Sequence, residues 1–389
     1  MRTGQKLIIM SKFDHIRPFY DTEVNDALRG IAHDPMMKAV MNFTFPDMKD
    51  EEWIQQLYKT HSIRDFQINF IYHAINMILS KTSDGLTTSG FDNLTANTAY
   101  LFISNHRDII LDTSLLNYSL YNHGFKMTTS AIGDNLVKNP FLHTLSKVTR
   151  NFIVQRGLPS RELLESSRLM SEFIKDSLMH ENRSVWMAQR EGRTKDGNDA
   201  THKGVLKMIA MAKGDMPDME YFKQLKIVPV SISYELDPTD VLKMPELMAR
   251  ARTEPYVKNI NEDFISLRSG LMGQKKRIHI HVGKVLDHEI DDIISQYPST
   301  NKQLQALCDV IDEAILSNYR LWPTNYIAHD LLYKSNQYAT HYTDVEKEEF
   351  EARLHQGVDT ADELAVNNFL AMYANPVSNQ MALKVPHND

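Results

Sequence analysis

Short apolar runs alternate with helical stretches between residues 99 and 286, and this alternation constrains the fold more than any other feature of the chain. Strands joined through helices pair in parallel, so the pattern predicts an α/β domain with a mostly parallel central sheet flanked by helices. One clear helical candidate between the runs is Ser160 to His180. The predicted strands are AYLFISN (99–105), FKMTTSAI (125–132), RNFIVQR (150–156), SVWMAQ (184–189), KIVPVSISYE (226–235) and KRIHIHVGKVL (276–286).

Helical regions are predicted on both sides of this domain. Near the N-terminus, DMKDEEWIQQL (47–57) leads an apolar run with acidic residues, as helix starts do. Near the C-terminus, NKQLQALCDVIDEAILSNY (301–319) has apolar residues at helical spacing. The turn-rich stretch SDGLTTSGFDNLTAN (83–97) separates the first helices from the strands. We therefore predict a helical N-terminal region (13–90), an α/β domain (91–298) and a helical C-terminal region (299–389) whose tail, from residue 375, is frayed.

Charge and cysteine content narrow the class of function. The net charge of −7 argues against nucleic acid as the main partner, because a phosphate backbone selects a basic surface. The single cysteine, Cys308, excludes an internal disulfide framework and indicates a reducing cytoplasm. FQINFIYHAINMIL (66–79) is too short and too polar for a transmembrane span, and LIIM (7–10) is too short for a signal-peptide core.

A histidine follows the first predicted strand, and two carboxylates follow the histidine. The stretch is SNHRDIILD (104–112), with His106, Asp108 and Asp112. Ligands bind beyond the carboxyl ends of strands in open α/β sheets. A histidine oriented by an aspartate can take a proton from a hydroxyl, which here would belong to the substrate. Taken alone, the stretch is as typical of a histidine that caps a helix beside solvated acids.

Three further segments follow predicted strands or lie within one. FIVQRG (152–157) ends in Arg156 and a glycine, and QREGRTKDG (189–197) has Gly192 for a sharp turn and Arg193 to grip a phosphate. Residues 189–207 have five Lys or Arg against three Asp or Glu, so this stretch is basic in an acidic chain. In IVPVS (227–231), Pro229 indicates a strand start or an edge strand. Each segment alone has a plain structural explanation, such as an exposed arginine or a polar turn.

In this order and at this spacing, the four segments resemble the glycerolipid acyltransferase family, which includes 1-acylglycerol-3-phosphate and glycerol-3-phosphate acyltransferases. The resemblance covers roughly residues 95–290 and looks like a divergent bacterial branch. It implies His106 as the base that deprotonates the acceptor hydroxyl and the following aspartate as its orienting partner. It also implies substrate-binding roles for Asn105, Arg107, Arg156, Glu191, Gly192, Arg193 and Pro229.

Two departures from the family pattern stand out. The family has four residues between His and Asp, whereas Asp112 follows His106 after five and Asp108 after one. We predict that Asp112 partners His106, because residues two apart on a helix do not face each other. Asp108 is then the N-cap of the helix that carries Asp112, and is kept as the alternative partner. The third block also lacks the usual aromatic-Pro before Glu191.

The expected reaction is O-acyl transfer from acyl-CoA or acyl-carrier protein to a hydroxyl of glycerol-3-phosphate or lysophosphatidate. It requires no metal or redox cofactor. The acceptor is a lipid or a lipid precursor, so we expect a cytoplasmic enzyme of phospholipid biosynthesis that associates peripherally with the inner face of the cell membrane. Donor, chain length and oligomeric state remain open.

Two other functions fit the same motifs. The acceptor could be a lyso-amino-acid lipid, or the chain could be a non-catalytic acyl-thioester- or lipid-binding protein on the same fold. A kinase-like catalytic loop at His106 to Asp108 fails because the expected asparagine is Thr113. A metal site at His279 and His281 lacks an evident third ligand, and a half-exposed strand is the more usual meaning of KRIHIHV.

Overall fold

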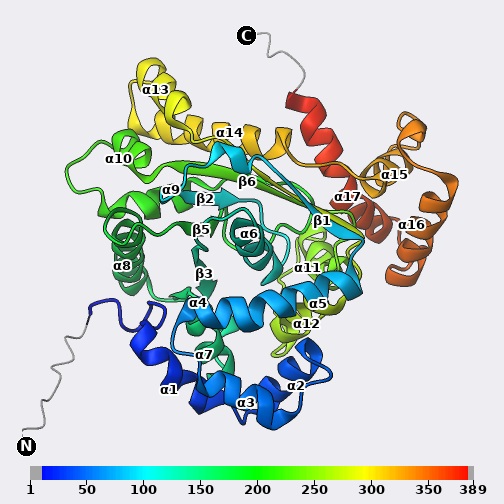
Figure 1. Ribbon diagram of the computed structural model, residues 1–389. Coiled ribbons are helices and arrows are strands. Elements are labelled where there is room, and N and C mark those ends of the chain that lie inside the picture. Colours follow the sequence, from blue (N-terminus) through cyan, green and yellow to red (C-terminus); the bar gives the residue numbers. More distant parts are fainter. Residues whose placement is uncertain (1–10, 384–389) are drawn as a thin grey trace, which may run out of the picture.

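The structure is a computed structural model that describes residues 11–383, so the apolar run at 7–10 and residues 384–389 of the tail lie outside the described part. A seven-stranded sheet forms its centre, with the order β1-β7-β6-β2-β5-β3-β4 (Figure 1). All neighbouring strands are parallel except the pair β6–β7. The predicted fold class is therefore confirmed. The strands are β1 Gly85–Ser89, β2 Leu101–Ser104, β3 Thr129–Gly133, β4 Asn151–Val154, β5 Val185–Ala188, β6 Ile227–Tyr234 and β7 Arg277–Val282.

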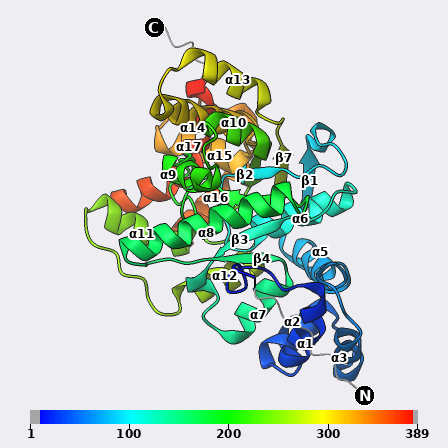
Figure 2. The same ribbon diagram turned by 90° about the vertical axis from the view of Figure 1, so that its left-hand side faces the viewer.

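Helices cover both faces of the sheet because side chains alternate between the faces along each strand. On β2, Leu101 and Ile103 face a core shared with α8, α9, α10, α13 and α14, whereas Phe102 faces a core shared with α5 and α6 (Figure 2). The helices of these two layers are α5 Tyr72–Thr82, α6 Leu111–Asn122, α8 Ser160–Met179, α9 Lys203–Ile209, α10 Asp218–Leu225, α13 Asp287–Gln296 and α14 Thr300–Ser317.

Two further apolar clusters lie beside the sheet. The N-terminal helices pack with α7 in one of them, and α11 packs with the last three helices in the other. Within the described residues, no helix is long and apolar enough to cross a membrane. The remaining helices are α1 Asp21–Ile31, α2 Pro35–Thr44, α3 Asp50–Tyr58, α4 Ile63–Phe66, α7 Pro140–Val148, α11 Asp240–Ala251, α12 Glu262–Met272, α15 Pro323–Leu332, α16 Asp344–Gly357 and α17 Glu363–Leu383.

The structure corrects two predictions, one at the N-terminal boundary of the α/β domain and one at the C-terminal end of the chain. The turn-rich stretch 83–97 contains the edge strand β1, which pairs with β7 from Gly85 opposite Arg277 to Ser89 opposite His281. Glycine and serine conceal this strand in the sequence, because its stability comes from pairing with a distant partner. At the other end, α17 continues to Leu383, so residues 375–383 are helical where we predicted fraying.

The histidine pair of β7 is bound by hydroxyls of β1. Thr87 Oγ1 lies 2.8 Å from His279 Nδ1, and Ser89 Oγ lies 2.9 Å from His279 Nε2 and 2.8 Å from His281 Nδ1. Burial lowers the pKa of His279 to about 4, so this ring is neutral near pH 7. Among residues 11–383, no three His, Cys, Asp or Glu side chains are grouped as metal ligands would be. Both histidines therefore have a structural explanation.

Pro229 lies inside the sheet, which corrects the prediction of an edge strand. It is opposite Ile103 of β2, while the ladder between β6 and β7 begins one residue later, at Val230. Its carbonyl accepts a hydrogen bond from Gly283 N at 2.9 Å, on the β7 side of the strand. The N–H and C=O groups of one strand residue point to the same side. The position of the N–H that proline lacks therefore faces β7, where the ladder between β6 and β7 has not yet begun. The proline thus costs no ladder hydrogen bond.

Candidate active site

The histidine of the first motif lies just beyond the carboxyl end of β2. Asn105 anchors the chain there: its amide donates to Ile232 O at 2.8 Å and accepts from Ile232 N at 2.8 Å. Thr194 N donates to the His106 carbonyl at 2.8 Å, which ties the loop after β5 to the same place. Because β2 lies between β5 and β6, His106 is positioned from both neighbouring strands.

His106 and Asp112 form a dyad. His106 Nδ1 lies 2.7 Å from Asp112 Oδ2, and the Asp112 side chain is fully buried. The same oxygen accepts from the backbone N–H of Arg107 at 2.7 Å and of Asp108 at 3.0 Å, and Oδ1 accepts from the Tyr234 hydroxyl at 2.8 Å. Three donors besides the imidazole therefore hold the carboxylate in place.

The imidazole ring is held on its other side by Trp186 of β5. The two rings meet edge to face, with centroids 5.6 Å apart and an interplanar angle of 72°. Trp186 is itself fixed by the hydrogen bond from its Nε1 to Ser104 Oγ at 3.0 Å. Nε2 of His106 takes part in no side-chain hydrogen bond within residues 11–383. With Nδ1–H donating to Asp112, Nε2 presents a lone pair that can accept a proton from a substrate.

Asp108 shapes the turn that accommodates the extra residue between His106 and Asp112. Its Oδ1 accepts from the backbone N–H of Ile110 at 2.9 Å and of Leu111 at 2.7 Å, which closes the turn that leads into α6. The N-cap of α6 is Ile110, so the prediction that Asp108 is the N-cap is wrong. Its Oδ2 is buried without a hydrogen-bond partner. Burial raises the pKa of Asp108, and the charge of Asp112 raises it further. Asp108 thus supports the turn, while Asp112 reaches the imidazole.

Gly270 of α12 packs directly against Asp108. A Cβ at Gly270 would lie 2.0 Å from Asp108 Oδ2, so a larger residue would force the Asp108 carboxylate or the helix to shift. In a helix interior, Gly→Ala ordinarily stabilises by about 0.5–1 kcal/mol. Here we expect Gly270→Ala to lower the free energy of unfolding by about 1–3 kcal/mol. We also expect a lower kcat, because the clash displaces the His106 loop; urea unfolding and initial rates measure the two effects.

A second substitution tests whether the clash is the cause. Asp108→Ser in the Gly270→Ala background removes Oδ2 and keeps a hydroxyl that can accept from the same backbone N–H groups. This double variant should recover most of the lost stability. If Gly270→Ala alone were as stable and active as the unmodified protein, α12 would not be packed on the histidine loop.

Two residues expected at the substrate are structural instead. Asn105 is buried and uses its amide on the backbone of β6, as described above. Arg107 is buried as well, and its Nη2 lies 2.5 Å from Asp199 Oδ2. Its guanidinium also lies over the Tyr319 ring, 5.5 Å from the centroid. Burial alone would lower the pKa of Arg107, but the charge of Asp199 raises it above the ordinary value, so this arginine is a buried cation with its own counter-ion.

The other charged residues of the motifs lie at the carboxyl ends of β4 and β5. Arg156 Nε lies 4.0 Å from Glu191 Oε1, and both side chains are partly or largely exposed. Gly192 has a φ of +73°, a backbone conformation that suits glycine and turns the loop after β5. Arg193 is half-buried, with one long contact of 3.4 Å from Nη1 to Thr239 Oγ1. These arginines are therefore only lightly engaged by the protein and are available to an anion.

Helix α12 and the loop before it also contact the residues at the carboxyl ends of the strands. Asn135, just after β3, donates to Asp263 Oδ2 at 2.9 Å, and Lys258 Nζ lies 2.8 Å from Asp263 Oδ1. Arg156 lies near Asn135, because a Cβ at Gly133 would meet both of their side chains within 3 Å. The carboxyl ends of β2, β3, β4 and β5 thus converge with α12 on one side of the sheet.

Sequence patterns did not identify Tyr234, Trp186 or Gly270 as parts of this site. Tyr234 and Trp186 were included only in predicted strands, and no local spacing links them to His106. The order of the strands in the sheet brings Tyr234 and Trp186 to His106, because parallel pairing aligns the carboxyl ends of β2, β5 and β6.

Part of the chain matches a known protein family. Residues 85–233, which span β1 to β6, match the family model described as Acyltransferase. Among solved structures, the 1-acyl-sn-glycerophosphate (LPA) acyltransferase PlsC from Thermotoga maritima is similar, with 14% sequence identity and a TM-score of 0.39. The match covers 74% of this chain and 91% of the other. No curated protein sequence matches the chain.

Proposed function

We propose that the chain is a glycerolipid acyltransferase, and the match of residues 85–233 to the Acyltransferase family model supports this proposal. The enzyme transfers a fatty acyl group from acyl-CoA or acyl-carrier protein to a hydroxyl of glycerol-3-phosphate or lysophosphatidate. The observation that carries the proposal is the His106–Asp112 contact of 2.7 Å beyond the carboxyl end of β2, with Nε2 left for a substrate.

The reaction follows from the dyad. Nε2 of His106 takes the proton of the acceptor hydroxyl as its oxygen attacks the thioester carbonyl carbon. Asp112 stabilises the imidazolium that forms. When the C–S bond breaks, the imidazolium returns the proton to the leaving thiolate, so the products are an oxygen ester and a free thiol. General-base assistance of this kind contributes about 10²–10⁴-fold to the rate.

The acceptor phosphate fits the arginines at the carboxyl ends of β4 and β5. Arg156 and Arg193 come from neighbouring loops. Arg156 has one loose ion pair, with Glu191 at 4.0 Å, and among residues 11–383 no carboxylate forms an ion pair with Arg193. A guanidinium binds phosphate through charge-assisted bonds worth about 1.5–3 kcal/mol. Binding there places the acceptor hydroxyl toward His106, and such orientation is a large part of catalysis.

Arg193→Ala is expected to raise the acceptor KM by about 10-fold or more, with a much smaller effect on the thioester KM. Arg193→Lys keeps the positive charge but loses the two-pronged geometry of the guanidinium. Its acceptor KM should therefore lie between those of the unmodified protein and Arg193→Ala. Arg64→Ala, which removes an exposed arginine of α4, is the matched control and should change neither constant. Equal effects of Arg193→Ala on both KM values, or none, would contradict a phosphate site and favour a lyso-amino-acid acceptor.

The acceptor is identified by a direct assay. Purified protein is incubated with a labelled acyl thioester and a panel of acceptors, and mass spectrometry reads the products. We expect label in lysophosphatidate or phosphatidate. Label in an amino-acid lipid would replace the proposed acceptor, and absence of product with every acceptor would favour a binding protein. We place the enzyme in the cytoplasm, peripherally on the inner face of the cell membrane, because its acceptor and product enter phospholipid synthesis.

A further inference from the structure

We propose that Lys243 of α11 is a positioning residue for the His106–Asp112 dyad: it holds a peptide group of the histidine loop that in turn holds Asp112. Lys243 Nζ donates to the Arg107 carbonyl at 3.2 Å, and the Lys243 side chain is only 1% exposed. The residue lies beyond 85–233, the segment that matches the family model. The inference rests on the proposed function, because it assigns a role in the same reaction.

Two consecutive peptide groups of the histidine loop hold the Asp112 carboxylate. Their N–H groups belong to Arg107 and Asp108, and both donate to Asp112 Oδ2, at 2.7 and 3.0 Å. The carbonyl of the first group is bonded to the loop after β5. The carbonyl of the second group, Arg107 O, accepts from Lys243 Nζ. Each peptide group is therefore bonded at both ends, once to the catalytic carboxylate and once to another element of the fold.

The bond from Lys243 acts on the second peptide group in two ways. It fixes the position of that group. It also makes Asp108 N a stronger donor to Asp112, because hydrogen bonds to the carbonyl and from the N–H polarise one peptide group in the same sense. A carboxylate held in this way keeps the imidazole of His106 oriented toward the acceptor, and orientation is a large part of catalysis.

Lys243 can hold this group because its own position is fixed. Its Nζ forms an ion pair with Asp237 Oδ2, while Asp237 Oδ1 accepts from Thr239 N and from Thr239 Oγ1, both at 2.8 Å. Burial would raise the pKa of Asp237, but the charge of Lys243 holds that pKa below its ordinary value. The carboxylate therefore stays ionised near pH 7 and keeps the ammonium group in place.

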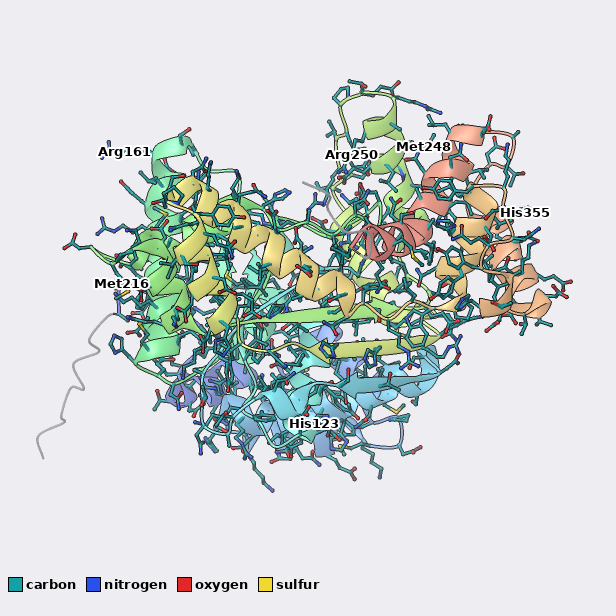
Figure 3. The ribbon with its side chains drawn as sticks, turned by 90° about the horizontal axis from the view of Figure 1, so that it is seen from above. His123, Arg161, Met216, Met248, Arg250 and His355 are labelled. Carbon is teal, nitrogen blue, oxygen red and sulfur yellow. The ribbon has the colours of Figure 1, made fainter. Side chains whose placement is uncertain are left out.

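The last helices of the chain fix the start of α11. Arg353 of α16 donates through Nε to Asp240 Oδ2 at 2.7 Å, and the hydroxyl of Tyr373 in α17 donates to the same oxygen at 2.6 Å. The Tyr373 oxygen also accepts from Asp237 N at 3.1 Å. Figure 3 shows α17 beside α11, and their apolar side chains share one cluster. The helical C-terminal region therefore reaches the dyad through Lys243.

The test compares two variants of the full chain. Lys243→Met keeps a long side chain and removes the charge, but it leaves Asp237 buried without its cation, which is strongly destabilising. Lys243→Met/Asp237→Asn removes both charges, so it should recover most of the thermal stability that the single variant loses. We expect this double variant to retain a loss of about 10- to 100-fold in kcat, with both KM values unchanged, because only the orientation of the dyad is affected.

Hydrogen exchange follows the histidine loop without an enzyme assay. In the double variant, the backbone amides of Arg107 and Asp108 should exchange about tenfold faster or more, because the loop opens more often. Lys147→Met is the matched control, since Lys147 of α7 is a buried lysine whose Nζ donates to another backbone carbonyl, Asp14 O at 3.0 Å. It should leave kcat and the exchange of both amides unchanged.

The two measurements separate this role from the proposed function. If the double variant matched the unmodified protein in kcat and in the exchange of the two amides, Lys243 would serve only as the partner of Asp237 and the proposal would be overturned. A change in only one of the two, in an active protein, would overturn it as well. If exchange rises as expected but no form of the protein transfers acyl groups, the positioning of the loop by Lys243 stands and the proposed function fails.

Discussion

His106→Ala is expected to lower kcat for acyl transfer by about 10²–10⁴-fold while the protein remains folded. Within the described residues the ring makes one hydrogen bond, to Asp112, and one aromatic contact, with Trp186, and its side chain is partly exposed at the site. The loss should fall mainly on kcat, because His106 acts when the acceptor oxygen attacks. Steady-state rates with both substrates saturating measure this effect.

The control for this prediction is His61→Ala, which removes an exposed histidine far along the chain from the site. It should leave kcat unchanged. Circular dichroism and thermal unfolding establish that both variants are folded. A folded His106→Ala protein that kept more than about a tenth of the unmodified rate would exclude the general-base role, since that role is worth about 10²-fold or more.

Asp112→Asn is expected to lower kcat by about 10²-fold or more, because the neutral amide no longer stabilises the imidazolium. The structure adds a cost in stability that the sequence did not predict. Oδ2 accepts three N–H groups and Oδ1 accepts the Tyr234 hydroxyl, so the carboxylate is part of the fold of this loop. We expect the free energy of unfolding to fall by about 1.5–3 kcal/mol, the usual worth of hydrogen bonds to a charged group.

Two variants separate charge from positioning at Asp112. Tyr234→Phe removes one of the four hydrogen bonds but keeps the carboxylate, so its loss of kcat should be much smaller. Asp108→Ala removes the two hydrogen bonds that close the turn before α6 and should cost about 1 kcal/mol with a modest loss of rate. If Asp108→Ala lost activity by orders of magnitude and Asp112→Asn did not, the catalytic roles of the two aspartates would be reversed.

The strands of the α/β domain were predictable because each is a short run of buried, mostly β-branched or aromatic residues. The six predicted runs each contain a strand of the sheet, although β3 begins at Thr129, later than the apolar run at 125. The edge strand β1 was not predictable, since its residues GLTTS read as a turn and only pairing with β7 makes them a strand. The antiparallel direction of β7 also depends on tertiary packing and has no local signal.

The same distinction holds within the site. His106 and Asp112 lie six positions apart, so the motif itself suggests their contact. Tyr234 and Gly270 come to this loop from more than 120 positions along the chain, and their hydrogen bond and close approach arise from strand order and helix packing. For Arg107, the motif suggests a substrate-binding role that the fold does not support. A motif places it beside the catalytic histidine, but only the fold shows that Asp199 and Tyr319 enclose its guanidinium.

Acceptor-dependent release of thiol tests the central claim most directly. Purified protein is mixed with an acyl thioester, and the free thiol is followed with and without lysophosphatidate while mass spectrometry counts the ester formed. We predict that thiol release requires the acceptor, that one ester forms for each thiol, and that both products fall by about 10²-fold or more in His106→Ala. Thiol release at the same rate without acceptor, or ester formation that persists in His106→Ala, would contradict acyl transfer by this dyad.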